Sequence, residues 1–159
     1  MKGCIYKIIF ILKEYIHFMK KGYFIKTKEE LEQIIQDGDF RKLQIYTHDG
    51  LLTFEDIYID RYGTIIRPAH TVANKINVVA RVTPFDCHSC TQNAGYTLIT
   101  IYGHSYTLHR LVASTWCYKR DDCDEIDHRD MNKKNCSASN LEWVTRRENM
   151  RRYYENKNN

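Results

Sequence analysis

The C-terminal third of the chain carries an ordered pattern of elements that limits how it can fold. Residues 125–128 (EIDH) and 141–145 (LEWVT) are predicted as two short strands, and a polar loop separates them. Thr145, followed three positions later by Glu148, forms a capping box, which predicts a helix that runs to about Asn156. This region is therefore expected to fold as strand, loop, strand and helix.

A second capping box lies near the N-terminal end. Thr27 is followed by Glu30, and apolar residues then recur at helical spacing. This pattern predicts a short helix over 28–37, with Gly38 as its stop signal.

The middle of the chain is strand-like. Apolar residues over 42–67 are interrupted by turn signals at 49–50 and 62–63, which predicts antiparallel strands. Residues 68–94 show no clear period and are predicted as a long irregular segment.

A hairpin and a helix are predicted next. Residues 96–102 (YTLITIY) are rich in strand formers and are predicted as a strand. A turn is expected at 103–104, and 105–109 are predicted as the second strand of the hairpin. Apolar residues at helical spacing then predict a helix over 109–117, with His109 as a structural residue at its start. The predicted fold class is α+β.

Composition bounds the class of protein but not its function. The chain has 159 residues, a formal net charge of +4 and 28% charged residues, which is typical of one globular domain with at most a small appendage. The apolar stretch in 4–19 is interrupted by charges and is too short for a membrane span, so no membrane association is expected. Met19 remains an alternative start of the natural protein.

Six cysteines raise the question of a metal site. Cys87 and Cys90 have the spacing of a zinc knuckle, but no second close pair of ligands accompanies them. A structural zinc is therefore the less favoured interpretation, and free thiols in a reducing compartment are preferred.

Four polar residues fall at the ends of the C-terminal elements. Asp127 and His128 end the first strand, Asn140 opens the second, and Asn149 lies in the first turn of the helix. Asp127 and the amide oxygen of Asn149 are hard ligands suited to Mg²⁺ or Mn²⁺, and His128 can accept a proton from water. Because neighbours on a strand point to opposite faces, Asp127 and His128 can share a site only if the strand ends, bulges or twists there.

At these residues the sequence resembles the HNH nuclease family, particularly the branch of phage and intron-borne homing endonucleases. The similar segments are HRLVASTW, EIDHRDMNKKN and NLEWVTRREN, over about 110–149. Upstream, 58–67 (YIDRYGTIIR) is similar to a segment that often precedes the nuclease core. Arg129 and Met131 depart from the Ile and Gly of the family pattern.

The resemblance implies a role for each matched position. It implies that His128 is the general base, that Asp127 and Asn149 bind the metal, and that Asn140 is the middle residue of the motif, which ties the loop and holds the strand of the base. It also implies a ββα-metal fold, one Mg²⁺ or Mn²⁺ for each site, and nicking or cutting of double-stranded DNA.

Basic residues near these positions are candidates for phosphate contact. The terminal helix is predicted to carry both a metal ligand and several arginines, so contact with DNA is preferred over a merely solvated face. The candidates are Lys133, Lys134, Arg146, Arg147, Arg151 and Arg152.

Together these patterns predict a metal-dependent HNH endonuclease of the homing type. The expected organisation is an N-terminal helical appendage (1–40), a β-rich DNA-contacting region (41–94) and an HNH nuclease domain (95–159). A monomer or weak dimer in the host cytoplasm is expected. The alternatives are a catalytically inactive DNA-binding protein on the same scaffold and a zinc-organised interaction module.

Overall fold

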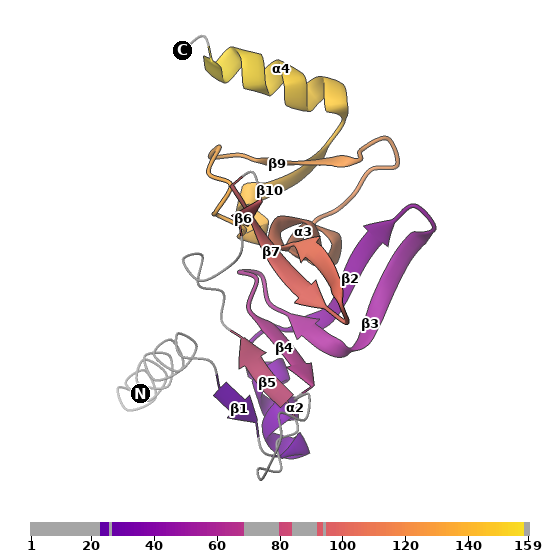
Figure 1. The fold of residues 1–159 in the computed structure, drawn as a ribbon, viewed down its shortest axis with the longest axis vertical. Helices are drawn as coiled ribbons and strands as arrows, with labels where there is room; N and C mark the ends of the chain where they lie inside the picture. Colours follow the sequence, from indigo (N-terminus) through magenta and orange to yellow (C-terminus); the bar gives the residue numbers. More distant parts are fainter. Residues whose placement is uncertain (1–22, 26, 69–79, 84–91, 94, 158–159) are drawn as a thin grey trace, which may run out of the picture.

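The computed structural model describes residues 23–25, 27–68, 80–83, 92–93 and 95–157 (Figure 1). In this part of the chain the elements are β1 (Tyr23–Ile25), α2 (Lys28–Asp37), β2 (Arg41–Thr47), β3 (Gly50–Ile59), β4 (Ile65–Pro68), β5 (Ala80–Thr83), β6 (Gln92–Asn93), β7 (Tyr96–Ile101), β8 (His104–Thr107), α3 (Leu108–Trp116), β9 (Glu125–His128), the 3₁₀ turn η1 (Ala138–Asn140), β10 (Leu141–Val144) and α4 (Arg146–Lys157). The mixture of helices and small antiparallel sheets confirms the predicted α+β class.

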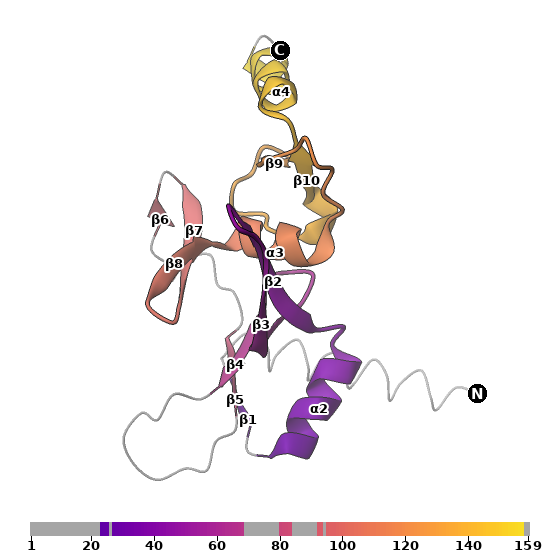
Figure 2. The same ribbon diagram turned by 90° about the vertical axis from the view of Figure 1, so that its right-hand side faces the viewer.

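One end of the molecule is an antiparallel sheet with the order β1-β5-β4-β3-β2, and α2 lies beside it (Figure 2). Leu31, Ile34 and Ile35 of α2 pack against buried residues of this sheet region. Thr27 caps the helix as predicted, since its Oγ1 accepts the Glu30 N–H at 3.1 Å. Gly38 follows the helix with a φ of −93°, and the left-handed conformation falls instead on Asp39.

The predicted turns and strands in the middle of the chain are present. β2 and β3 form a hairpin that turns before Gly50, and Gly63 turns the chain between β3 and β4. The hairpin of β7 and β8 turns at Tyr102 and Gly103, one residue earlier than predicted. Both residues have positive φ, the conformation of the two-residue turns that match strand twist.

The segment 68–94 was predicted as one irregular stretch, but the structure contains two short strands within it. Residues 80–83 pair with β4 and β1, and 92–93 pair with β7. Long-range strand pairing, which leaves little periodic signal in such short segments, explains the difference. Cys87, Cys90 and the N-terminal residues through 22 lie outside the described part of the chain, so the zinc and start-site predictions do too.

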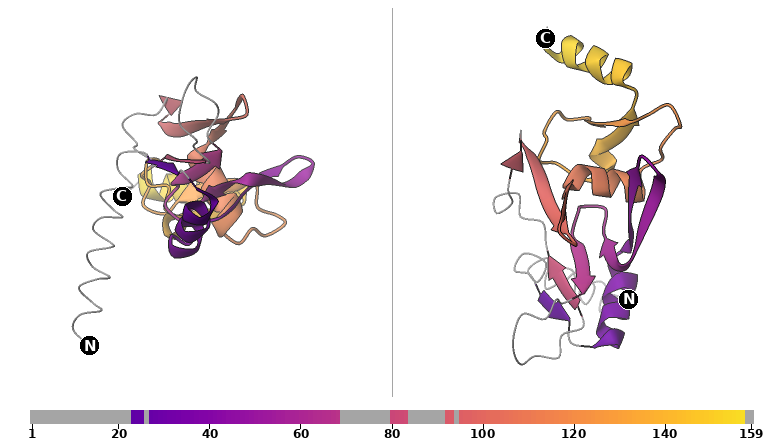
Figure 3. Two further views of the ribbon diagram at one scale, coloured as in Figure 1. Left: turned by 90° about the horizontal axis from the view of Figure 1, so that it is seen from below. Right: turned by 45° about the vertical axis from the view of Figure 1, so that its right-hand side comes forward.

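Helix α3 lies at the centre of the main core, between the β7–β8 hairpin and the β2–β3 hairpin (Figure 3). Leu108, Leu111 and Val112 are fully buried and pack with β2, β3 and β10. Trp143 is 4% exposed and donates its indole N–H to the Ala113 carbonyl, which confirms it as a core residue. Residues on both sides of position 94 therefore share one hydrophobic core, and the predicted domain boundary there stays a prediction.

A different helix lies at each end of the described region. Helix α4 crosses β9 at the end opposite α2 (Figure 1). None of the helices in the described residues is long and apolar enough to span a membrane.

Candidate active site

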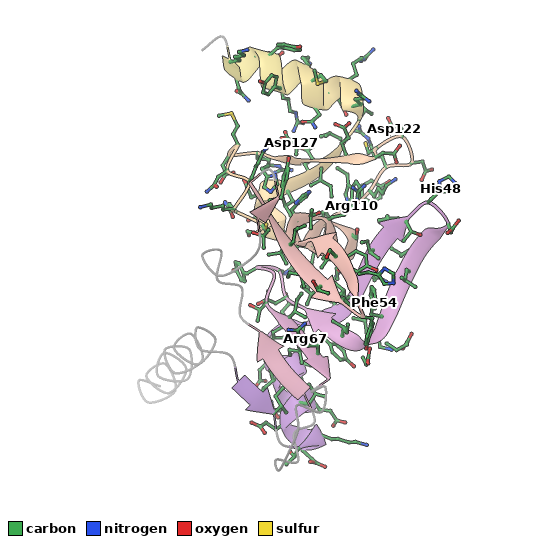
Figure 4. All side chains as sticks on the ribbon, viewed as in Figure 1. His48, Phe54, Arg67, Arg110, Asp122 and Asp127 are labelled. Carbon is green, nitrogen blue, oxygen red and sulfur yellow. The ribbon has the colours of Figure 1, made fainter. Side chains whose placement is uncertain are left out.

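Asp127 and His128 are adjacent at the end of β9, and strand pairing directs them to different faces. The strands are antiparallel, with His128 opposite Leu141 and Asp127 opposite Glu142. His128 is therefore on the side of buried Leu141, and its exposed fraction is 5%. Asp127 is on the face that α4 crosses (Figure 4), where its Oδ2 accepts a hydrogen bond from Nη1 of Arg152 at 2.9 Å.

Both side chains nevertheless line one groove of about 470 Å³. Asn149 and Arg152 of α4, Lys133 of the preceding loop and Tyr96 of β7 line it as well. Strand β9 ends at His128, so a groove at this end of the strand can be lined by residues from both of its faces. The structure thus brings three of the four predicted site residues to one groove.

The start of α4 sets the position of Asn149. Glu148 Oε2 accepts the Thr145 N–H at 2.8 Å, and the Glu148 N–H donates to Thr145 Oγ1 at 3.2 Å, so the predicted capping box is reciprocal. Nη2 of Arg120 also donates to both oxygens of Glu148. The hydrogen bonds from Thr145, with the added effect of Arg120, lower the pKa of Glu148 to about 2. Asn149 follows this residue and donates its Nδ2 to Glu125 Oε2 at 2.7 Å.

Asn140 closes the loop between β9 and β10. Its Nδ2 donates to Asp130 Oδ1 at 2.8 Å and to the Asn135 carbonyl at 2.9 Å, and its Oδ1 accepts the Asp130 N–H at 3.1 Å. Asp130 also accepts from the backbone of Asn132. Hydrogen bonds, first among them that from Asn135, lower the pKa of Asp130. Asn140 lies outside the groove lining and binds the loop that carries Lys133.

The buried setting of His128 favours its neutral form. Burial lowers the pKa of the imidazole, although the nearby carboxylates of Asp130 and Asp127 act in the opposite direction. A neutral imidazole has one nitrogen with a lone pair, which is the form that can accept a proton.

The donor atoms fit a hard divalent cation. Oδ2 of Asp127 is paired with Arg152, and Oδ1 makes no hydrogen bond within the described residues. The Nδ2 of Asn149 is held by Glu125, which leaves the amide oxygen as its ligand atom. In the described residues no three His, Cys, Asp or Glu side chains converge as a metal cluster. A pair of oxygen ligands leaves coordination positions for water and phosphate.

These positions match a known family. Residues 122–151 match the family model described as HNH endonuclease. The C-terminal region of this chain is thus similar to the HNH endonucleases. The matched residues contain β9, β10 and the start of α4, so the HNH region includes all four predicted catalytic and metal-binding positions.

Two curated relatives are similar to the HNH region. The DNA endonuclease I-HmuI of Bacillus phage SP01 is 37% identical over 60 residues, which are 35% of this chain and 34% of that protein. An uncharacterized HNH endonuclease of Acanthamoeba polyphaga mimivirus is also 37% identical over 60 residues, 35% of this chain and 18% of that protein. The chain thus spans about a third or less of each relative.

A solved structure of I-HmuI, described as DNA binding and cleavage by an HNH homing endonuclease, resembles this fold. The TM-score is 0.44 at 17% sequence identity, over 74% of this chain and 60% of that chain. The sequence match, and not this structural likeness, identifies the HNH region.

The six predicted phosphate-contacting residues fall into three settings in the HNH region. Lys133 and Arg152 line the groove, and Arg152 is half-buried in ion pairs with Asp127 and Glu142 at 2.9 and 3.0 Å. Arg146 and Arg147 are exposed in the first turn of α4. Lys134 is exposed in the loop, and Arg151 is exposed with Glu155 at 3.7 Å.

Sequence reasoning missed two contributors to the site. Arg120 lies in the charged loop before β9, and nothing in its local pattern indicates the contact with Glu148. His109 was predicted as structural, yet its ring centroid lies 5.1 Å from that of His128. Its position directly before Arg110 in the HRLVASTW segment was the available signal.

Met131, which replaces the glycine of the family pattern, adopts a strained conformation. Its φ is 61°, and it is 65% exposed, so little packing compensates for the left-handed backbone. Met131→Gly is expected to raise the free energy of unfolding by about 0.5–1 kcal/mol, the strain relieved less the added chain entropy. Urea unfolding measures the change. Met131→Ala keeps a Cβ and should show no gain; equal gains in both variants would contradict the strain argument.

Proposed function

We propose that this chain is a metal-dependent HNH endonuclease that hydrolyses a phosphodiester bond in double-stranded DNA. The observation that carries the proposal is the meeting of Asp127, His128 and Asn149 at one groove, at positions inside the matched HNH region. The phage relative is named a DNA endonuclease, which supports DNA as the substrate.

Each of the site residues named below has a distinct task in this reaction. His128 takes the proton from the attacking water as general base. Asp127 and Asn149 hold one Mg²⁺ or Mn²⁺ through their oxygen atoms. When bound, this ion would hold the scissile phosphate and stabilise the negative charge that develops on the leaving oxygen. Asn140 keeps the loop in place, and Arg152 fixes one oxygen of Asp127.

Arg152 has a further consequence for charge at the site. Its guanidinium already contacts Asp127 and Glu142, so it balances two carboxylates that would otherwise face each other across β9 and β10. Both contacts are made by its Nη1. We therefore assign it first to the arrangement of Asp127 and second to DNA.

Metal dependence tests the proposed function directly. Supercoiled plasmid is incubated with the protein and Mg²⁺ or Mn²⁺, with and without a chelator. Nicked or linear product is expected only when the ion is available, because Asp127 is negative and Asn149 is neutral, so neither can stabilise the negative charge on the leaving oxygen without the ion. Undiminished cleavage with the chelator would contradict a metal-dependent reaction.

The same assay separates the proposed function from its alternative. DNA binding without cleavage, on DNA shown to contain a bound site, would favour an inactive DNA-binding protein on the HNH scaffold. The groove that holds Asp127, His128 and Asn149 in the described part of the chain would cut one strand at a time, which predicts a nick as the first product. We propose that the protein is a monomer or weak dimer. A double-strand break that appears without a nicked intermediate would indicate two chains acting together.

Exposed arginines at the start of α4 predict a salt-dependent affinity for DNA. Each phosphate contact adds about 0.9 to the slope of log K against log salt concentration. The double variant Arg146→Gln/Arg147→Gln should therefore lower the magnitude of this slope by about 2. Fluorescence anisotropy with labelled duplex measures it. Lys28→Gln, on exposed α2 at the opposite end of the molecule, is the control and should leave the slope unchanged.

A further inference from the structure

Three aromatic rings from three elements meet behind the groove. The ring centroids of Tyr96 on β7 and His109 on α3 lie 4.8 Å apart, and those of His109 and His128 lie 5.1 Å apart. The Tyr96 and His128 centroids are separated by 6.1 Å. His128 is therefore in contact with a second histidine from an element distant in sequence.

The two histidines share an unusual feature. Nδ1 of His109 and Nε2 of His128 are the buried side-chain polar atoms without a hydrogen-bond partner in the described part of the chain. A buried polar atom left unpaired costs about 1–3 kcal/mol, so native structures tolerate few of them. Two such atoms on neighbouring rings indicate a functional arrangement and not two independent defects.

The hydrogen-bonding capacities of the two atoms are complementary. A neutral imidazole carries a hydrogen on one nitrogen and a lone pair on the other. If His128 is to accept a proton at Nδ1, its Nε2 carries the hydrogen and needs an acceptor. Nδ1 of His109 is an acceptor whenever the hydrogen of that ring is on Nε2. The two rings meet edge to face, with an angle of 60° between their planes.

Neither nitrogen makes a hydrogen bond in the structure, and we propose that His109 is a positioning residue for the general base, because a rotation of the two adjacent rings would bring the Nε2–H of His128 onto Nδ1 of His109. This contact selects the tautomer of His128 that has its lone pair on Nδ1 and fixes the orientation of the ring. The inference rests on the proposed function, because it assigns His128 as the base. It adds a residue that the matched segment 122–151 does not contain.

The environment of His109 supports its role as an acceptor. Burial, together with the positive charge of His128, Arg110 and Lys133, lowers the pKa of His109 to about 3. A neutral His109 has a lone pair that can accept a hydrogen bond, and it places no positive charge beside His128. The ring of Tyr96 packs against the ring of His109 and limits its rotation.

The tautomer of His128 gives a test that needs neither metal nor DNA. The ¹⁵N chemical shifts of the His128 ring are measured at about pH 8, above the ordinary imidazole pKa. Wild type is expected to show hydrogen on Nε2. A wild-type spectrum with hydrogen on Nδ1 would overturn the proposal, whatever the enzymatic result.

Two variants separate hydrogen bonding from packing. His109→Phe keeps a buried aromatic ring but has no acceptor, and we expect the His128 tautomers to become mixed. His109→Asn places a carbonyl oxygen near the position of Nδ1 and should restore the Nε2–H form. An unchanged tautomer in His109→Phe would show that His109 only packs, and would overturn the proposal.

Kinetics give a second readout. His109→Phe should lower kcat by about 10- to 100-fold, the range for outer partners that orient a functional imidazole, with KM unchanged. His109→Asn should recover part of the loss. A rise in KM with kcat unchanged would overturn the proposal. If wild type cleaves no DNA, the proposed function fails, and the tautomer measurement still decides whether His109 orients His128.

Discussion

Replacement of His128 by alanine is expected to slow DNA cleavage by about 100- to 10,000-fold and to leave DNA affinity unchanged. The variant lacks the base that accepts the proton of the attacking water, and general base catalysis contributes this range of rate. The oxygen atoms of Asp127 and Asn149 remain, so metal and DNA should still bind. Single-turnover nicking of supercoiled plasmid measures the rate, and anisotropy with labelled duplex measures affinity.

A matched histidine provides the control for this prediction. His104 is exposed on β8 and has no contact with the groove lining, so His104→Ala should cleave at the wild-type rate. Thermal unfolding of both variants shows whether lost packing contributes, because His128 is buried. Cleavage by His128→Ala at the wild-type rate, in a folded protein, would remove His128 from the reaction.

Replacement of Gly63 by alanine is expected to lower the free energy of unfolding by about 2–5 kcal/mol. Gly63 has a φ of +90°, and a Cβ there would lie 2.9 Å from Cδ2 of Leu108. Leu108 is fully buried at the start of α3 and has no room to move away. Backbone strain of about 1–2 kcal/mol and overpacking of about 1–3 kcal/mol combine to give this range. Urea unfolding measures it as a shift in midpoint without a change in slope.

A substitution at Gly50 distinguishes backbone strain from overpacking. Its φ is +118°, but nothing lies within 4 Å of an added Cβ. Gly50→Ala should therefore lose only the backbone contribution of about 1–2 kcal/mol. Equal losses at both positions would show that the contact with Leu108 adds nothing.

Most secondary structure could be predicted because its determinants are local. Thr27 Oγ1 accepts the N–H of Glu30, and Thr145 Oγ1 likewise accepts the N–H of Glu148, and both helices begin where these residues predict. The short strands at 80–83 and 92–93 could not be predicted in this way. Their hydrogen bonds go to partners distant in sequence, and so short a segment shows no period.

The same distinction between local and long-range determinants applies to the candidate site. The order of Asp127, His128, Asn140 and Asn149 was visible as a motif, and the structure places three of them at one groove and the fourth in the adjoining loop. The neighbours that set their chemical environment were not visible. Arg152 pairs with Asp127 from α4, Arg120 holds Glu148, and His109 approaches His128 from α3.

By itself the sequence determined most of the elements, the capped starts of α2 and α4, and the candidate residues of the site. Only the tertiary structure decided that Gly63 lies against Leu108, that Asp127 and His128 reach one groove from different faces, and that two unpaired imidazole nitrogens lie on adjacent rings. The reason is physical. Caps and turns form hydrogen bonds within a few residues, whereas these contacts depend on how α3, β7, β9 and α4 pack around a common core.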